Sequence, residues 1–266
     1  MKLRKVLCIG GSDSSGGAGI QADLKAVSAC GCWGLTVVTA VTAQNTKGVS
    51  GIYPVDPAFV AKQMDVVLSD IGVDAIKTGM LPTEEIIQVV VKKIKKYKLK
   101  NVVVDPVMIA KGGRTLMTGK ARQMLVQTLL PLALVITPNI PEAETLSKNK
   151  IKTMADMKDA AAVIYESGAA NVVIKGGHLP DRKHADVTDI LYSGSGYCEF
   201  SSARIRSCHT HGTGCTFASG LASGLARRKS LADAVLQAKI TVADAIRKAV
   251  VLGHGYGSVN VFEKFS

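Results

Sequence analysis

Aromatic residues are scarce in this 266-residue sequence, where they account for 5% of the chain and include a single Trp. Proteins that bind nucleic acid commonly stack bases on aromatic side chains, and neither a zinc-finger spacing nor an RNA-recognition motif is present. No stretch contains the roughly 18 uninterrupted apolar residues that a membrane-spanning helix requires. The N-terminal segment turns glycine-rich at Gly10 and Gly11, before the apolar core of a signal peptide could form. These absences argue against a membrane protein and a nucleic-acid-binding protein, and they predict a cytoplasmic location.

The overall composition is that of a globular protein, because 47% of the residues are hydrophobic and 20% are charged. Lys and Arg number 33 against 21 Asp and Glu, which gives a formal net charge of +12. This excess suits an anionic partner, either nucleic acid or a small phosphate-bearing substrate. Six of the lysines lie in residues 92–100, where apolar residues recur between them at helical spacing. We interpret this run as the solvated face of an amphipathic helix, which favours the small substrate.

The cysteines are too few for a disulfide-stapled protein of this size, so we expect free thiols. They are Cys8, Cys30, Cys32, Cys198, Cys208 and Cys215. Residues 208–215 bring four potential zinc ligands together: Cys208, His209, His211 and Cys215. Neither Cys/His pair has zinc-finger spacing, so zinc is the weaker interpretation of this segment.

Short runs rich in Val and Ile, without alternating polar residues, are typical of strands buried on both faces. They occur at residues 6–9, 35–41, 73–76, 102–104, 132–136 and 172–174. Helical patterns lie between most of them, at residues 20–29, 57–68, 83–97, 119–130 and 154–167. The alternation predicts an α/β fold with a doubly wound, mainly parallel central sheet and helices on both faces.

Residues 189–204 depart from this alternation. Two short strand-like segments flank Ser193-Gly194-Ser195-Gly196, which predicts an antiparallel hairpin. The sequence after the hairpin is mostly helical in pattern. Because no linker, repeat or low-complexity segment interrupts the chain, we expect residues 1–266 to form a single domain.

In a doubly wound sheet, ligands bind beyond the carboxyl ends of the parallel strands, so the residues that follow each strand are the candidates for chemistry. These positions hold glycines and polar groups. They are the glycine-rich loop 10–19, Gln44, the segment 77–80, Asp105, the segment 137–142 and the segment 175–178. We expect them to meet at one edge of the sheet.

The glycine-rich loop after the first strand resembles two phosphate-binding motifs without matching either. Gly17 and Ala18 stand where a P-loop carries its Lys and Ser/Thr. A dinucleotide-binding loop would be followed about 20 residues later by an acid, which residues 39–43 do not provide. Two interpretations remain: a tight strand-to-helix turn, or a loop whose backbone closes over a small flat substrate, with Asp23 on the following helix.

The segment Gly212-Thr213-Gly214-Cys215 opens a helix built of small residues. Free N–H groups at a helix start, together with glycines that let a ligand approach the backbone, favour binding of an anion such as phosphate. The helix dipole is expected to lower the pKa of the Cys215 thiol and to make it a candidate base. The alternative is that Cys215 is a small buried residue that packs the helix.

Asp105, Asn139 and Glu142 follow neighbouring strands and offer the hard oxygen ligands that Mg²⁺ prefers. Asn139 and Glu142 also have the spacing of a helix capping box, which is their simplest explanation in isolation. Lys175 ends a Val-Val-Ile strand at the ligand edge, where its charge suits a phosphate. His178, His209 and His254 are interpreted as structural polar residues.

Together these motifs resemble those of the ribokinase-like superfamily, and within it the hydroxymethylpyrimidine and phosphomethylpyrimidine kinases of thiamine biosynthesis. The resemblance runs through GGSDSSGGAGIQADLK, TAVTAQNTKGV, IKTGML, VVVDPVM, ITPNIPEAE, VIKGGH and THGTGCTFASGLA. It implies phosphorylation of 4-amino-5-hydroxymethyl-2-methylpyrimidine by ATP with Mg²⁺, a second transfer to the monophosphate, and a homodimer.

The resemblance also implies a role for each matching residue. Gly212, Thr213 and Gly214 would bind the transferring phosphoryl group, and Cys215 would be the base. Asp105 and Glu142 would organise Mg²⁺, while Lys175, Asn139 and Thr213 would contact the nucleotide. The substrate pocket would consist of Gly11, Ala18, Asp23, Thr42, Gln44, Met80 and Val107. Thr42 departs from the family pattern, which often has Val there, and adds a hydroxyl to the pocket wall.

Two other functions remain open at this point. A pyridoxine or pyridoxal kinase would act on a substrate of similar shape, a flat methylated heteroaromatic ring with a hydroxymethyl arm. A non-catalytic sensor could keep the pocket and use the lysine run for nucleic acid. The combination of Asp105, Lys175 and Cys215 argues against the sensor, which has no need of a phosphoryl-transfer site.

Overall fold

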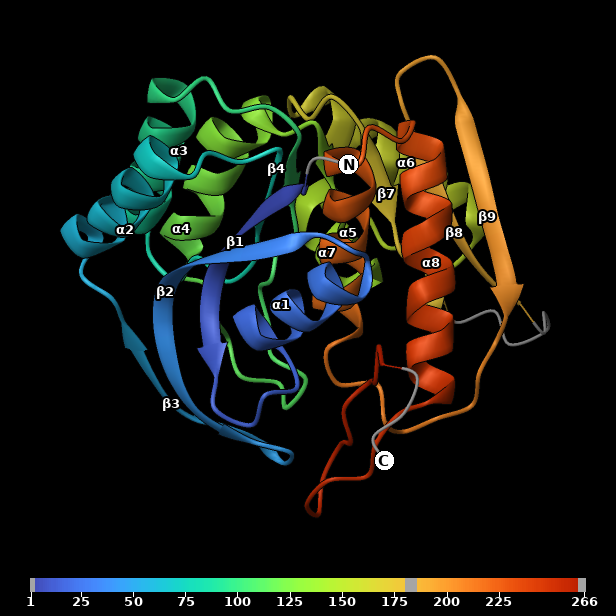
Figure 1. The fold of residues 1–266 in the computed structure, drawn as a ribbon. Helices are drawn as coiled ribbons and strands as arrows, with labels where there is room; N and C mark the ends of the chain where they lie inside the picture. Colours follow the sequence, from blue (N-terminus) through green and yellow to red (C-terminus); the bar gives the residue numbers. More distant parts are fainter. Residues whose placement is uncertain (1–2, 180–185, 263–266) are drawn as a thin grey trace.

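The computed structural model describes residues 3–179 and 186–262. Within these residues, nine strands form one mixed sheet in the order β3-β2-β1-β4-β5-β6-β7-β8-β9 (Figure 1). They are β1 (Lys5–Asp13), β2 (Trp33–Asn45), β3 (Gly48–Pro54), β4 (Ala75–Thr78), β5 (Val102–Val104), β6 (Val135–Ile136), β7 (Val172–Ile174), β8 (Asp186–Tyr192) and β9 (Tyr197–Ala203). The six central strands β2, β1, β4, β5, β6 and β7 are parallel, while β3, β8 and β9 pair antiparallel with their neighbours. The mainly parallel sheet and the hairpin predicted at residues 189–204 are confirmed.

Helices cover both faces of the sheet, as predicted. They are α1 (Gly19–Ala29), α2 (Pro57–Asp70), α3 (Glu84–Lys96), α4 (Gly119–Met124), α5 (Ile140–Ser147), α6 (Met154–Glu166), α7 (Thr213–Ala226) and α8 (Leu231–Arg247). Residues of α2 to α6 pack in one apolar core with strand residues such as Leu7 and Ile9. Residues of α1, α7 and α8 pack on the opposite face with Val6 and Cys8 (Figure 1). Successive strand residues point to opposite faces, so each buried strand serves both cores.

Helix α3 shows how the lysine run is accommodated. Thr83 accepts a hydrogen bond from the Ile86 N–H and caps the helix start, where Glu84 and Glu85 complement the helix dipole. The apolar face of the helix is buried and the lysines lie on the other side. Lys96 and Tyr97 both bind Asp65 on α2, at 3.2 and 2.8 Å. The prediction of an amphipathic helix with a solvated basic face is confirmed.

Several boundaries differ from those predicted. The strand expected at residues 35–41 continues to Asn45, because its polar end pairs with β3, a strand that the apolar runs did not indicate. The helix expected at residues 119–130 is α-helical only to Met124 and continues as the π-helical turn Leu125–Leu129. Pro131 lies in the 3-10 turn Leu130–Leu132, which occupies the start of the strand expected at residues 132–136, and the strand is limited to Val135–Ile136.

The chain after the hairpin is mostly helical, as expected, because α7 and α8 make up most of it, but the described residues after α8 are irregular. Gly253, Gly255 and Gly257 disfavour a helix in this stretch. Isolated bridges connect Ser258 with His211 and with Val250. The segment therefore returns to the edge of the sheet where the candidate residues lie.

Candidate active site

A cavity of about 520 Å³ lies beyond the carboxyl ends of the parallel strands. This volume is in the range of sites for small molecules. It is lined by the loop after β1, the ends of β2, β4, β5, β6 and β7, and the start of α7. Every residue that the sequence predicted for substrate, nucleotide, metal or catalysis lines this cavity. The structure thus brings the predicted residues together, while their individual roles stay predictions.

The start of α7 forms one wall of the cavity. Gly212 is the N-cap and has a left-handed backbone, with φ of 88°. A Cβ atom at this position would lie 2.0 Å from the Gly17 carbonyl oxygen, so only glycine fits. Gly214 lies beside two charged groups, since a Cβ there would be 3.6 Å from Lys175 Nζ and 3.8 Å from Asp105 Oδ2. The helix N-terminus, a cation and a carboxylate therefore converge on one point.

Lys175 and Asp105 form an ion pair at that point. Lys175 Nζ lies 3.2 Å from Asp105 Oδ1, and the two residues follow β7 and β5. The Lys175 backbone is fixed by its N–H, which donates to the Pro138 carbonyl at 2.9 Å. Burial opposes the charge of Lys175, but the carboxylates of Asp105 and Glu142 outweigh that effect and raise its pKa. Lys175 is thus a stable positive charge at the cavity wall.

Asn139 and Glu142 form the capping box of α5 that their spacing indicated. The Glu142 N–H donates to Asn139 Oδ1 and the Asn139 N–H donates to Glu142 Oε2, both at 2.9 Å. Burial raises the pKa of Glu142 to about 7, with the charge of Lys175 opposing and that of Asp105 adding to the rise. Two carboxylates that share this buried position, Asp105 and Glu142, are the hard oxygen donors that fit Mg²⁺. The capping box and a metal role are compatible.

Cys215 lies in the first turn of α7 and is partly accessible from the cavity. The predicted lowering of its pKa is wrong, because burial raises the pKa of the thiol to about 12. The charge of Lys77 and the Gly19 N–H oppose this rise, while Asp23 and Asp105 add to it. The helix dipole acts on the thiol, but loss of solvation and the two nearby carboxylates have the larger effect.

Asp23 lies at the floor of the cavity in a buried ion pair that the sequence did not indicate. Its Oδ1 atom lies 2.9 Å from Lys77 Nζ and accepts a hydrogen bond from Ser219 Oγ at 2.8 Å. Three elements, α1, β4 and α7, are thereby joined below the cavity. A Cβ at Gly79 would lie 2.7 Å from Lys77 Nζ, so the glycine leaves room for the ammonium group. A lysine within the buried strand β4 was the available signal for this pair.

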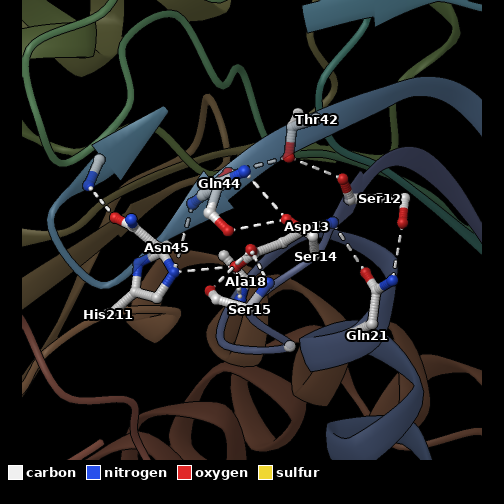
Figure 2. A network of polar contacts seen from close by, with 12 residues as sticks. Ser12, Asp13, Ser14, Ser15, Ala18, Gln21, Thr42, Gln44, Asn45 and His211 are labelled. Carbon is white, nitrogen blue, oxygen red and sulfur yellow. Dashed lines mark hydrogen bonds and ion pairs between the residues drawn. The ribbon is translucent and has the colours of Figure 1, made fainter. Parts of the chain in front are cut away.

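A second polar network that the local sequence patterns did not indicate surrounds Asp13 and His211 (Figure 2). Asp13 Oδ2 accepts from the Ala18 N–H at 2.8 Å and lies 2.9 Å from His211 Nε2. Its Oδ1 atom accepts from the N–H and hydroxyl of Ser15. Burial alone would raise the pKa of Asp13, but the bonds from His211, Ser15 and Ala18 lower it to about 2. This carboxylate fixes the shape of the glycine-rich loop.

The histidines near α7 have partners other than a metal. His211 binds Asp13, and His209 Nδ1 accepts from the Gly257 N–H at 3.0 Å. In the part of the chain that the structure describes, no group of three His, Cys, Asp or Glu side chains is arranged to hold a metal ion. The zinc interpretation of residues 208–215 is therefore unsupported. His178 lines the cavity, where burial and the charge of Lys175 lower its pKa.

The loop between β5 and α4 forms the outer wall of the cavity and is tied to two distant segments. Arg114 donates to the carbonyl oxygens of Val49 and Ser50 on β3, at 3.0 and 2.7 Å. Lys111 lines the cavity, and its ammonium group lies 4.7 Å from the centre of the Tyr256 ring.

None of the described helices is long and apolar enough to cross a membrane.

A helix N-terminus, a lysine and two carboxylates meet at the strand ends of this doubly wound sheet. This fold and this site define a kinase of the ribokinase-like class. The sequence profile described as phosphomethylpyrimidine kinase matches residues 13–260, and the chain belongs to this family. The chain is 44% identical over 262 residues to the hydroxymethylpyrimidine/phosphomethylpyrimidine kinase of Bacillus subtilis, covering 98% of this chain and 96% of that protein.

Two further relatives show the range of similar proteins. The thiamine biosynthesis bifunctional protein ThiED of Geobacter sulfurreducens is 52% identical over 255 residues, which are 96% of this chain but 51% of that protein. The chain therefore spans about half the length of this relative. Among solved structures, the ADP complex of Bacillus subtilis pyridoxal kinase matches with a TM-score of 0.90 and 40% identity, covering 97% of each chain.

Proposed function

We propose that the protein transfers the γ-phosphoryl group of ATP to the hydroxymethyl group of 4-amino-5-hydroxymethyl-2-methylpyrimidine, and then to the monophosphate, in thiamine biosynthesis. The observation that carries this proposal is the convergence of Gly214, Lys175 and Asp105 in the cavity that Gln44 and Cys215 also line. Phosphoryl transfer depends mainly on positioning and charge stabilisation, which this arrangement supplies. The relative from Bacillus subtilis that the chain matches over nearly its full length is a hydroxymethylpyrimidine/phosphomethylpyrimidine kinase, which supports the pyrimidine as the acceptor.

In this proposal the chain's charged groups act on the phosphates. The N–H groups at the start of α7 and the Lys175 ammonium stabilise the negative charge that develops on the transferring group. Asn139 and Thr213 contact the nucleotide. Asp105 and Glu142 would hold Mg²⁺, which supplies positive charge to the phosphates when it is bound with ATP.

The remaining residues hold the acceptor and take its proton. Gly11, Ala18, Thr42, Gln44, Met80 and Val107 surround the pyrimidine ring, above the Asp23–Lys77 pair. Cys215 accepts the proton of the attacking hydroxyl, as a thiolate or through a short relay. Because the pKa of Cys215 is raised, the thiolate is a minor species. The positive charge of Lys77 partly offsets the rise and favours the thiolate. A loose transition state leaves the hydroxyl proton in place until late, so little thiolate is required.

Pyridoxal or pyridoxine is the second candidate acceptor. The similarity to Bacillus subtilis pyridoxal kinase supports it, because the two backbones match over nearly their full lengths. Gln44 and Met80 could contact either ring. The non-catalytic sensor receives no such support, since a sensor has no need of the Lys175–Asp105 pair.

The test is phosphate transfer from Mg·ATP by the purified protein. The acceptors are hydroxymethylpyrimidine, its monophosphate, pyridoxine and pyridoxal, compared at equal concentration by kcat/KM. We expect the highest value for the pyrimidine and a second turnover on the monophosphate. A preference for the pyridines would move the activity to vitamin B6 salvage, and absence of transfer to any acceptor would overturn the kinase assignment.

We further propose that the chain acts as a single kinase domain, in the cytoplasm, and as a homodimer. An exposed apolar pair on the edge hairpin supports the dimer: Val41 and Tyr53 lie opposite each other on β2 and β3, with 49% and 75% of their surface exposed. Exposed apolar side chains that lie side by side offer surface that a second copy could bury. Light scattering of the purified protein, with Tyr53→Lys as the variant, measures the assembly; a monomeric wild-type protein would contradict it.

A further inference from the structure

Gln44 lies in the middle of a short chain of polar contacts that starts at Thr42 and ends at Asp13 (Figure 2). In the structure its Oε1 atom lies 3.3 Å from Thr42 Oγ1, and its Nε2 atom lies 3.4 Å from His211 Nε2. The oxygen and nitrogen of an amide are nearly identical in shape, so the partners at each end decide which atom faces which neighbour. Both partners can be assigned from their own hydrogen bonds.

At the His211 end of the amide, the hydrogen-bonding role of His211 follows from that of Asp13. The Asp13 carboxylate receives hydrogen bonds from the Ser15 N–H, the Ser15 hydroxyl and the Ala18 N–H, so it acts as an acceptor throughout. His211 Nε2 lies 2.9 Å from Asp13 Oδ2, which requires the hydrogen to be on that nitrogen. A nitrogen that carries a hydrogen cannot accept one from the Gln44 amide. The Gln44 atom that faces His211 must be the oxygen.

At the Thr42 end of the amide, the hydrogen-bonding role of the Thr42 hydroxyl follows from that of the Ser12 carbonyl. The β1–β2 register places Asp13 opposite Thr42, which brings the Thr42 hydroxyl to the Ser12 carbonyl oxygen at 2.9 Å. A carbonyl oxygen only accepts, so the single hydroxyl hydrogen of Thr42 is directed at it. Toward Gln44 the hydroxyl presents lone pairs. The Gln44 atom that faces Thr42 must be the NH₂ nitrogen.

We infer that Thr42 and His211 are positioning residues that fix the Gln44 amide with its nitrogen toward Thr42 and its oxygen toward His211. This is the reverse of the orientation drawn in Figure 2, so the two amide atoms exchange places. One N–H of Gln44 then binds Thr42, and the other is left for a ligand. Because Gln44 lines the cavity, the site presents a fixed donor to a ring nitrogen of the heteroaromatic substrate. The inference rests on the proposed function for the identity of the ligand, but the orientation of the amide follows from the protein alone.

The orientation is measurable without activity. In ¹⁵N-labelled protein, nuclear Overhauser effects from the Gln44 side-chain NH₂ to the Thr42 methyl protons are expected, with weak or no effects to the His211 ring protons. The reverse pattern would overturn the inference. Gln44→Glu provides the assignment of the NH₂ signals, because it removes them.

The functional consequence is tested with a matched pair of variants. Thr42→Val is nearly isosteric and removes the acceptor for the Gln44 N–H, whereas Thr42→Ser keeps it. We expect Thr42→Val to raise the KM for the pyrimidine about 3- to 10-fold, with the KM for ATP unchanged, and Thr42→Ser to stay close to the wild type. His211→Ala should act in the same direction as Thr42→Val. In a Gln44→Ala background, Thr42→Val should have no further effect.

A substrate analogue separates positioning from pocket shape. The analogue has one ring nitrogen replaced by C–H, and each of the two nitrogens is replaced in turn. The wild type should discriminate against one of the two analogues, and Thr42→Val should reduce that discrimination while Thr42→Ser preserves it. Equal use of both analogues by an active wild-type enzyme, or unchanged discrimination in Thr42→Val, would contradict the inference and leave the kinase function intact. If no acceptor is phosphorylated, the proposed function fails, and the NMR measurement still decides the orientation.

Discussion

Lys77 Nζ lies 2.9 Å from Asp23 Oδ1, and neither residue is exposed to solvent. The pair connects β4 to α1 directly below the cavity, and Ser219 on α7 completes the hydrogen bonding of the carboxylate. The two charges of the pair also act on Cys215 in opposite directions: that of Lys77 lowers the pKa of the thiol, and that of Asp23 raises it. The ion pair therefore serves the fold and the electrostatics of the site at once.

Removing one member of this pair should be more harmful than removing both. Lys77→Met leaves the Asp23 carboxylate buried without its counter-ion, which should lower the free energy of unfolding by about 3–5 kcal/mol. The double variant Lys77→Met/Asp23→Asn should recover most of that loss. Urea unfolding of the two variants and the wild type measures the difference. Equal stability of the single and double variants would show that the pair is not electrostatically coupled.

Asp13 should stabilise the protein in a pH-dependent manner. Its pKa is lowered to about 2 in the fold from the ordinary value of 3.8. A carboxyl group with a lowered pKa contributes stability above its unfolded pKa and loses it as the pH falls through the folded value. The contribution at pH 7 is about 2 kcal/mol, from 1.4 kcal/mol per pH unit.

Chemical unfolding of Asp13→Asn at pH 7 and near pH 2 checks this expectation. The variant should be less stable than the wild type by about 2 kcal/mol at pH 7, and the difference should diminish as the pH approaches 2. Asp159→Asn, at an exposed position on α6, is the matched control and should change stability by less than about 0.5 kcal/mol at either pH. A constant difference across this pH range would argue against a lowered pKa for Asp13.

Cys215 should react slowly as a thiol, although it is the base in the proposed mechanism. Burial raises its pKa to about 12, so alkylation by iodoacetamide at pH 7 should be slower at Cys215 than at the exposed Cys198 and Cys208. Peptide mass spectrometry resolves the three sites.

Cys215→Ala should keep substrate binding but lower kcat by about 10²-fold or more. Full activity of this variant would remove Cys215 from the mechanism.

A methyl group at Gly212 should disrupt the phosphate-binding end of α7. Gly212→Ala places a Cβ against the Gly17 carbonyl and forces an L residue into a left-handed conformation, which costs about 1–2 kcal/mol from the backbone alone. Activity should fall more than stability, since the N–H groups that would bind the phosphoryl group move. Gly119→Ala is the control, because its Cβ would meet no atom within 4 Å. Comparable loss of activity in both variants would contradict a local effect.

The fold was largely predictable because its signals are local. Runs of Val and Ile such as Val102–Val104 are buried on both faces, and the helical patterns between them determine the alternation of layers. The candidate residues were found for the same reason, since parallel strands end at one edge of the sheet. Edge strand β3 carries no apolar run, so it was missed.

The sequence could not predict which polar residues bind one another across the fold. Asp13 and His211 are 198 positions apart, and Asp23 and Lys77 are 54 positions apart. Nothing in their local patterns indicates these partners. The pKa of Cys215 failed as a prediction for a related reason: the helix dipole is a local property, whereas burial and the carboxylates that surround the thiol come from other segments.

The outer wall of the cavity is held by contacts from Arg114 to β3 and from Lys111 to Tyr256. Any movement of that loop that admits a substrate or releases a product has to break contacts with both segments. Tyr256 does not line the cavity, yet it contacts Lys111, which does. The C-terminal segment therefore supports part of the cavity wall, although none of its described residues lines the cavity.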